Sequence, residues 1–242
     1  LYYTVFGLQG LAALGGNIDT SALVRYLDSF DNPQSLDFVS LACLIRCKSF
    51  IPDTVFNYDY VSALEKFRSC DGGFNNEPGA QKGTAYGCFL ALGAYQDMRI
   101  EMPNPAGLIA CLNSLKTVDS AYANDSTIRA GSVPGTAAAV CVLHYLYRKI
   151  DEDTLRWLVN HLASDGGFTA ADVVPFSDLL STATALYALN LTGYSVENFR
   201  EKCLDFVDTL WDGKGGFCGS IADKTCDCEY TFYGLLALGN LA

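Results

Sequence analysis

One sequence motif occurs three times along this chain. The segments "DGGFNNEPGAQKGTAYGCFLALGAY" (residues 71–95), "DGGFTAADVVPFSDLLSTATALYALNLTGY" (165–194) and "GGFCGSIADKTCDCEYTFYGLLALGNL" (215–241) each join a Gly-Gly-Phe turn to an apolar, helix-like run. Self-similarity with a period of roughly 20 to 50 residues is the signature of stacked supersecondary units. Because such a unit cannot bury its apolar face alone, the copies must pack against one another.

A threonine near the start of each apolar run aligns the copies. The anchors are Thr4, Thr84, Thr136, Thr182 and Thr231, with Val39 in the same slot of a weaker copy. Three positions later every copy has a small residue: Gly7, Ala42, Gly87, Ala139, Ala185 and Gly234. Small side chains at a fixed helical position let neighbouring helices approach closely.

Five amphipathic segments separate the six apolar runs, at residues 19–30, 53–70, 104–118, 151–164 and 195–211. Three of them lead into Gly-Gly-Phe, where we expect the glycine to form a left-handed helix C-cap. Six apolar and five half-exposed helices suit a closed double ring better than an open solenoid, whose ends would need polar caps. Strand signals are few, so we predict one all-α domain over residues 1–242.

Composition excludes several classes of function. Half of the residues are hydrophobic and 18% are charged, which favours a sizeable core over disorder. The net charge of -11 leaves no basic footprint for a general nucleic-acid binder and disfavours an anionic membrane surface. No apolar run reaches the roughly 20 residues that span a bilayer.

The chain has ten cysteines, yet it is too long and apolar for a disulfide scaffold. Cys43, Cys88 and Cys141 stand inside apolar runs, where cysteine acts as a small hydrophobe. Mostly reduced thiols favour a reducing compartment such as the cytoplasm, although the sequence leaves localisation open. The crowded loop "FCGSIADKTCDCE" is the exception, because its three cysteines could form a disulfide or bind a metal.

The phrase "GGF…D…YTFYGLLALG" resembles the repeat of the protein prenyltransferase β subunits and of the related squalene and terpene cyclases. The likeness covers essentially the whole chain. It implies an α/α6 toroid in which six parallel inner helices, enclosed by an outer ring of helices, surround a cavity that holds an isoprenoid chain. Whether the chain needs an α-subunit-like protein partner, as the resemblance suggests, stays open.

In that family the inner helices share one mouth, at their N-termini, where the chemistry takes place. The residues of this chain that precede the anchors are Tyr2, Tyr3, Asp37, Gln81, Lys82, Arg129, Ser132, Asp178 and Lys224 to Tyr230. Parallel helix N-termini would give the mouth a positive field suited to a diphosphate. Tyr86 and other aromatic residues of the inner helices either line the cavity or fill the core.

The resemblance breaks down at the family's zinc site, an Asp-x-Cys pair with a His from another repeat. In "KTCDCEYTFY", Asp227 fits the Asp, Lys224 fits a diphosphate-binding Lys and Tyr230 fits a Tyr. The Cys slot, however, holds Glu229, with Cys228 one place early. No mouth position carries His, so we expect no catalytic zinc of that type.

The general acid of the cyclases, an Asp-x-Asp-Asp run, is missing as well, and so is their Gln-and-Trp repeat signature. Two single carboxylates, Asp178 and Asp227, each precede an anchor threonine by four residues. They are either helix N-caps or mouth groups that bind a metal or act as acid and base.

The leading hypothesis is a prenyltransferase-like toroid that binds an isoprenoid in its cavity. In a catalytic version, allylic diphosphate chemistry proceeds without zinc. The residues assigned to it are Lys224 and Arg129 for phosphate, Asp227 and Glu229 for a divalent ion such as Mg²⁺ (with Cys228 as a further ligand), Tyr230 for the leaving group, Asp178 as a second catalytic carboxylate, and Tyr2, Tyr3, Lys82 and Tyr86 for substrate. The alternatives are a non-catalytic toroid that binds lipid or a partner protein, and an α/α-barrel carbohydrate enzyme with paired carboxylates.

Overall fold

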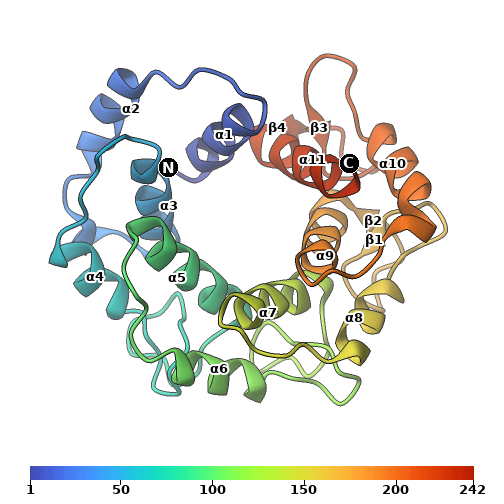
Figure 1. The fold of residues 1–242 in the computed structure, drawn as a ribbon, viewed down its shortest axis with the longest axis horizontal. Helices are drawn as coiled ribbons and strands as arrows, with labels where there is room; N and C mark the ends of the chain where they lie inside the picture. Colours follow the sequence, from blue (N-terminus) through green and yellow to red (C-terminus); the bar gives the residue numbers. More distant parts are fainter. The chain divides into compact units, whose positions relative to one another are not determined.

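The computed structural model describes residues 1–242 of the chain. It contains eleven α-helices, three short 3₁₀ helices and two hairpins of two-residue strands. The chain divides into two compact units, Leu1–Ser114 and Leu115–Ala242, each with its own internal packing (Figure 1). None of the helices combines the length and the apolar character needed to cross a bilayer. The single domain over 1–242 stays a prediction.

The N-terminal unit holds three of the predicted apolar helices and three amphipathic ones. Its elements are α1 (Tyr2–Ala13), α2 (Thr20–Leu27), η1 (Asp28–Phe30), η2 (Pro33–Ser35), α3 (Phe38–Ser49), α4 (Tyr58–Glu65), α5 (Ala85–Met98) and α6 (Pro105–Ser114). Helix α3 packs between α1 and α5, α2 and α4 lie against α3, and α6 lies against α5. The rings of Phe38 and Phe74 stack in its core with centroids 6.0 Å apart.

The C-terminal unit repeats this arrangement and adds the hairpins. Its elements are α7 (Val133–Tyr145), α8 (Glu152–Val159), β1 (Phe168–Thr169), β2 (Ser177–Asp178), α9 (Leu179–Leu191), η3 (Glu197–Phe199), α10 (Arg200–Thr209), β3 (Phe217–Cys218), β4 (Cys226–Asp227) and α11 (Cys228–Leu241). Helix α9 packs between α7 and α11, while α8 contacts α7 and α9, and α10 contacts α11. The predicted alternation of apolar and amphipathic helices is therefore confirmed.

In the C-terminal unit a threonine hydroxyl ties each apolar helix to the turn before it. The Oγ1 atoms of Thr136, Thr182 and Thr231 accept hydrogen bonds of 3.0, 2.9 and 3.3 Å from the backbone N–H groups of Tyr122, Phe168 and Phe217. Each of these aromatic residues follows the turn, fourteen residues before its threonine. Buried backbone N–H groups must be paired, so this hydrogen bond explains why the spacing of fourteen residues recurs in three repeats of the chain.

The predicted anchors of the first three copies are in the wrong register. Thr84 is the N-cap of α5, where its Oγ1 accepts from the N–H of Gly87 at 2.8 Å, so it matches Asp178, the N-cap of α9. The position fourteen residues after Phe74 is Cys88, which has no hydroxyl. A threonine can cap a helix or bond to a turn from inside it, and the sequence does not distinguish the two uses.

The same correction applies nearer the N-terminus. The N-caps of α1 and α3 are Leu1 and Asp37, and four residues further on stand Val5 and Leu41, in place of the predicted Thr4 and Val39. Both of the newly aligned residues are buried, with exposures of 8% and 0%. The first two copies thus fill the anchor slot with apolar side chains.

The small residues at Gly87 and Gly234 lie against turn residues, and their predicted role in close helix–helix approach stays a prediction. A Cβ added at Gly87 would lie 2.3 Å from the carbonyl oxygen of Phe74, and one at Gly234 would lie 2.6 Å from the ring of Phe217. The two glycines therefore make room for the turn residues of their own repeat, whereas Gly7 has nothing within 4 Å of such a Cβ.

The first glycine of the turn has the predicted left-handed conformation, with φ of 90° at Gly72, 91° at Gly166 and 124° at Gly215. Its predicted role as a helix C-cap is wrong, because the turn lies beyond the end of the amphipathic helix. In the second copy the N–H of Ala163 donates to the carbonyl of Gly167 at 2.8 Å and closes the turn. A Cβ at Gly166 would lie 2.0 Å from the carbonyl oxygen of Lys202, so the turn rests on α10.

Gly166→Ala should cost more stability than Gly193→Ala. Both glycines have positive φ, which costs an alanine about 1–2 kcal/mol, but only Gly166 meets a neighbouring backbone, and Gly193 has open space. We expect the Gly166 variant to lose at least ~2 kcal/mol more from overpacking. Urea unfolding of both variants measures the difference, and equal losses would show that the contact with α10 is unimportant.

Thr182→Val should destabilise the protein by about 1–3 kcal/mol, because the N–H of Phe168 would be left buried and unpaired. Thr184→Val is the matched control, since Oγ1 of Thr184 only donates to carbonyls of its own helix. We expect that control to change the free energy of unfolding by less than about 0.5 kcal/mol. Similar losses for both variants in denaturant titrations would contradict the proposed role of the threonine.

Candidate functional site

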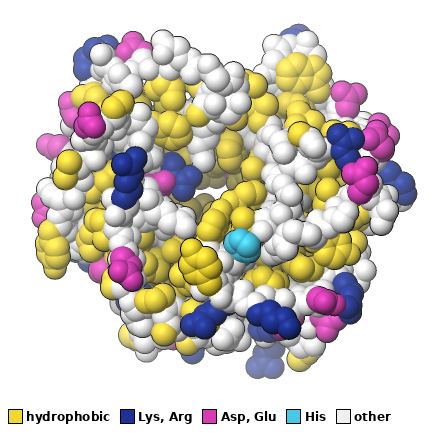
Figure 2. Space-filling model, in the orientation of Figure 1, with side chains coloured by type: hydrophobic (Ala, Val, Ile, Leu, Met, Phe, Trp, Pro, Cys, Tyr) yellow, Lys and Arg dark blue, Asp and Glu magenta, His cyan; other side chains and the backbone are white.

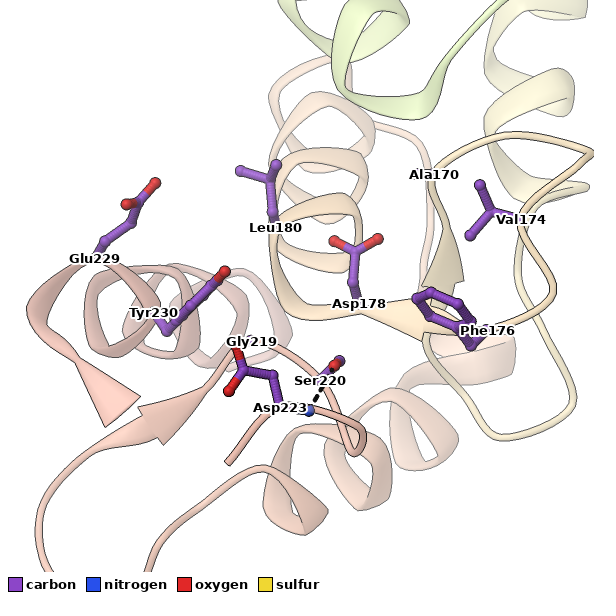
Figure 3. A pocket seen from close by; sticks show the side chains of 10 residues that line it. All are labelled: Ala170, Val174, Phe176, Asp178, Leu180, Gly219, Ser220, Asp223, Glu229 and Tyr230. Atoms are coloured by element: carbon purple, nitrogen blue, oxygen red, sulfur yellow. Dashed lines mark hydrogen bonds between the residues drawn. The ribbon is translucent and has the colours of Figure 1, made fainter. Parts of the chain in front are cut away.

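A pocket of about 370 Å³ lies in the C-terminal unit where α9 and α11 begin (Figure 3). Small-molecule sites usually occupy roughly 300–1,000 Å³, so this volume is at the lower end of that range. The residues that line it are Ala170, Val174, Phe176, Asp178, Leu180, Gly219, Ser220, Asp223, Glu229 and Tyr230. They come from the first turns of the two helices and from the loops of the two hairpins.

The two hairpins place these residues by the same construction. In β1–β2 Phe168 pairs with Asp178, and in β3–β4 Phe217 pairs with Asp227. Each hairpin therefore ends at the aspartate that starts the next helix. The carbonyl of Gly219, in the second loop, accepts from the N–H of Leu179 at 2.8 Å, which fastens that loop to the start of α9.

Asp178 caps α9 from inside the pocket. Its carboxylate accepts from the N–H and the Oγ of Ser181, both at 2.7 Å. Burial raises the pKa of Asp178 above its ordinary value, and the bonds from Ser181 offset only part of that rise. A carboxyl with a raised pKa exchanges a proton more readily near neutral pH than an exposed aspartate does.

Tyr230 covers the loop from the α11 side. Its ring lies against Gly219, where an added Cβ would come within 2.4 Å of Cζ. Burial raises the pKa of Tyr230, and the negative charges of Glu229, Asp227, Asp223 and Asp178 raise it further. In Figure 3 the tyrosine hydroxyl points from α11 toward α9. The phenol therefore stays neutral and can donate a hydrogen bond to a ligand.

The lining of the pocket is acidic. Three of its ten residues, Asp178, Asp223 and Glu229, are carboxylates, and none is Lys, Arg or His. On the face drawn in Figure 2, basic side chains stand singly or in pairs among acidic and apolar ones. The apolar part of the lining consists of Ala170, Val174, Phe176 and Leu180. Such a pocket suits an apolar group with a neutral or cationic polar end better than an anion.

The structure brings three of the predicted catalytic residues together, since Asp178, Glu229 and Tyr230 all line the pocket. Asp227 is the N-cap of α11, and its Oδ1 accepts from the N–H of Tyr230 at 2.9 Å. The capping interpretation of both aspartates is therefore confirmed. Their roles in catalysis stay predictions.

The two predicted phosphate-binding cations do not line this pocket. Lys224 is exposed in the 219–225 loop, and its carbonyl accepts from the thiol of Cys218 at 3.5 Å. Arg129 is exposed in the segment before α7. Contacts of these side chains with a phosphate stay predictions.

The other four predicted substrate-binding residues belong to the N-terminal unit. Tyr2 and Tyr3, in the first turn of α1, meet edge to face with ring centroids 5.5 Å apart. Nζ of Lys82 is 4.0 Å from Oδ2 of Asp71, and Tyr86, in the first turn of α5, is 41% exposed. Their contact with a substrate stays a prediction.

The donor groups do not fit a zinc site. Such a site needs three or four His, Cys or carboxylate ligands converging on one point, and no group of three is placed to do so. Of the histidines, His161 is buried, with Nδ1 2.9 Å from the carbonyl of Trp157. Magnesium needs only one or two carboxylates together with substrate phosphates, so the Asp227–Glu229 site for a divalent ion stays a prediction.

Sequence reasoning missed Phe176, Ser220 and Asp223, which line the pocket from the hairpin loops. The prediction considered only residues next to the helix starts. These residues could have been found from their position, because in each of these two repeats they lie between the Gly-Gly-Phe turn and the aspartate that caps the next helix. Asp223 accepts from the N–H of Thr225 at 2.9 Å, which lowers its pKa and keeps it charged.

The comparisons with known proteins come from a family model and from solved structures. The model described as "Prenyltransferase alpha-alpha toroid domain" matches residues 108–241, which is more than half of the chain. The Candida albicans protein geranylgeranyltransferase-I, solved in complex with GGPP, matches 98% of this chain and 82% of its own at 16% identity, with a TM-score of 0.76. No curated protein matches significantly. The all-α toroid fold expected from the repeats is confirmed.

Asp178→Asn and Asp37→Asn should change stability with pH in opposite directions. Asp37 caps α3 with the same geometry, accepting from the N–H and Oγ of Ser40 at 2.9 and 2.7 Å, but those bonds lower its pKa. Asparagine preserves both caps. The raised pKa of Asp178 means that wild-type stability from this group falls as pH rises above 3.8. The lowered pKa of Asp37 means the reverse, because its contribution is lost as pH falls below 3.8.

Unfolding free energies measured on both sides of pH 3.8 test this. Relative to wild type, the Asp178 variant should gain stability as pH rises and the Asp37 variant should lose it. Slopes of the same sign would refute the assigned environment of Asp178.

Proposed function

The chain belongs to the prenyltransferase alpha-alpha toroid family, and on that basis we propose that it binds an isoprenoid chain whose polar end lies at the acidic pocket. The fold match to an enzyme solved with GGPP is the observation that carries the proposal. On this proposal, the interior of the toroid holds the isoprenoid chain. The pocket between α9 and α11 offers a hydroxyl, a half-buried carboxyl and apolar side chains at a helix start.

The charge of the pocket argues for the kind of head group. A diphosphate placed beside Asp178, Asp223 and Glu229 would meet like charges, whereas an alcohol or an amine can accept from Tyr230 or donate to the carboxylates. We therefore assign the pocket a neutral or cationic head. The protein acts, on this proposal, as a binding toroid for a prenyl alcohol or a prenylated partner.

The second candidate is the catalytic version, in which Lys224 and Arg129 hold the diphosphate and Tyr230 orients the leaving group. It is favoured by the position of Lys224 in the same loop as Ser220 and Asp223, which line the pocket. The catalytic version requires the side chains of Lys224 and Arg129, which do not line the pocket, to reach a bound diphosphate. Whether an α-subunit-like partner takes part stays open in either case.

Displacement of a fluorescent prenyl probe tests the proposal. Geranylgeraniol and geranylgeranyl diphosphate should displace it at concentrations within about tenfold of one another, with or without Mg²⁺, because repulsion from the carboxylates offsets the hydrogen bond that Tyr230 can donate to the diphosphate. Displacement by neither compound at high micromolar concentration would overturn isoprenoid binding. A diphosphate bound about a hundredfold more tightly than the alcohol would overturn the neutral head and support the catalytic version.

A charge variant sharpens the test. Asp223→Asn combined with Glu229→Gln should tighten diphosphate binding roughly tenfold and leave the alcohol unchanged, because two like charges are removed from the lining. Asp205→Asn combined with Asp208→Asn, both exposed on α10, is the control that removes the same number of charges outside the pocket. If both variants alter diphosphate affinity equally, the head does not lie at this pocket.

A further inference from the structure

Two cysteines face each other across the β3–β4 hairpin. Cys218 and Cys226 are direct partners in the antiparallel register, and their Sγ atoms are 2.7 Å apart. Residues directly opposite in such a pair have Cα atoms about 4.5–5.5 Å apart, which falls within the roughly 4.4–6.8 Å that disulfides span. A bond between the two sulfurs therefore needs little movement of the backbone.

The pair is also reachable from solvent. Cys218 is buried, with 4% exposure, while Cys226 is half-buried. The other close pair, Cys88 and Cys111, has its Sγ atoms 3.9 Å apart, with exposures of only 0% and 1%. Access to at least one sulfur is what an external oxidant requires, so only the hairpin pair meets that requirement.

The hairpin loop links this pair to the pocket. Gly219, Ser220 and Asp223, which lie between the two cysteines, line the pocket. The thiols of Cys218 and Cys226 both donate to the carbonyl of Lys224, at 3.5 and 3.7 Å. Oxidation removes both thiol protons, so these two weak bonds would be replaced by a covalent link across the base of the loop.

We propose that Cys218 and Cys226 form a reversible redox-modification site, at which a small-molecule disulfide such as oxidised glutathione converts the two thiols into a hairpin disulfide that locks the 219–225 loop. The proposal does not depend on the ligand of the pocket.

The exchange balances in two steps. The Cys226 thiolate attacks oxidised glutathione, forming a mixed disulfide and releasing one glutathione thiolate. Cys218 then loses its proton and attacks the Cys226 sulfur, releasing the second glutathione. Two protein thiols are oxidised and one small-molecule disulfide is reduced to two thiols. The hydrogen bond with Cys218, together with burial, raises the pKa of Cys226 to about 11, so the first step is slow at neutral pH.

Peptide mapping of the native chain tests the bond itself. The protein is incubated with oxidised glutathione, its remaining thiols are alkylated, and the denatured product is cut with trypsin. Because Lys224 stands between the two cysteines, the disulfide should join the peptides 215–224 and 225–242. Cys88 and Cys111 should be alkylated only after denaturation.

The variants identify the partners. Cys228→Ser should leave the joined peptides intact, and Cys226→Ser should abolish them. A joined pair that depends on Cys228, or Cys226 trapped as a stable glutathione adduct beside a free Cys218, would overturn the proposal. If a variant fails to fold, fragmentation of the joined wild-type peptides between Cys226 and Cys228 decides which of the two cysteines is bonded to Cys218.

Native proteolysis tests the locking of the loop. Trypsin should cleave after the exposed Lys224 roughly tenfold more slowly in the oxidised protein, because opening of the loop is restrained. A reductant should restore the rate, and the Cys226→Ser protein should not respond to the oxidant. Equal cleavage of oxidised and reduced protein would refute the lock.

Discussion

The hydrogen bond from a turn N–H to a threonine hydroxyl inside the next helix is the interaction on which the C-terminal unit depends. It pairs the backbone N–H of the aromatic residue that follows each turn, which is Tyr122 after Ser-Ala and Phe168 and Phe217 after Gly-Gly. The turn is thereby held against the side of the helix, so the loop between the turn and the helix connects two points at a fixed distance. In two copies the ends of this loop pair as a β-hairpin, and the last residue of the hairpin, Asp178 or Asp227, is the N-cap of the helix. The pocket is the space left between two neighbouring hairpins of this kind.

A pocket made in this way inherits its chemistry from the caps. Helix starts favour carboxylates, because free backbone N–H groups and the helix dipole stabilise negative charge. Asp178 and Asp227 are the N-caps of α9 and α11, and Glu229 follows in the first turn of α11. The result differs from a helix start that is left open for an anion. Here side chains and a loop carbonyl of the protein already accept from N–H groups at which a phosphate would bind, so the acidic lining lies at a helix start that is closed to an anion.

The number and order of the helices could be read from the sequence, since apolar and amphipathic runs alternate without a break. The caps at Asp178 and Asp227 could also be predicted, as one of two interpretations, because aspartate is a preferred residue just before an apolar helix. The register of the early copies could not, since Thr84 caps a helix while Thr182 bonds to a turn, and both are threonines near a helix start. The lining residues Phe176 and Asp223 were missed for a different reason. Their place depends on hairpin pairing between two-residue strands, which leave no periodic pattern.

The bond from the Leu179 N–H to the Gly219 carbonyl has a counterpart one repeat earlier, where the Val133 N–H donates to the carbonyl of Ala170. In both cases a helix obtains the partner for its first amide from the repeat that comes after it. During synthesis on a ribosome, α9 therefore emerges with its first amide unpaired and is completed only after some forty further residues, from 179 to 219, have left the exit tunnel. Completion of each helix along the nascent chain thus lags one repeat behind translation. On a stalled ribosome, the first backbone amide of the last emerged helix would still be bonded to water.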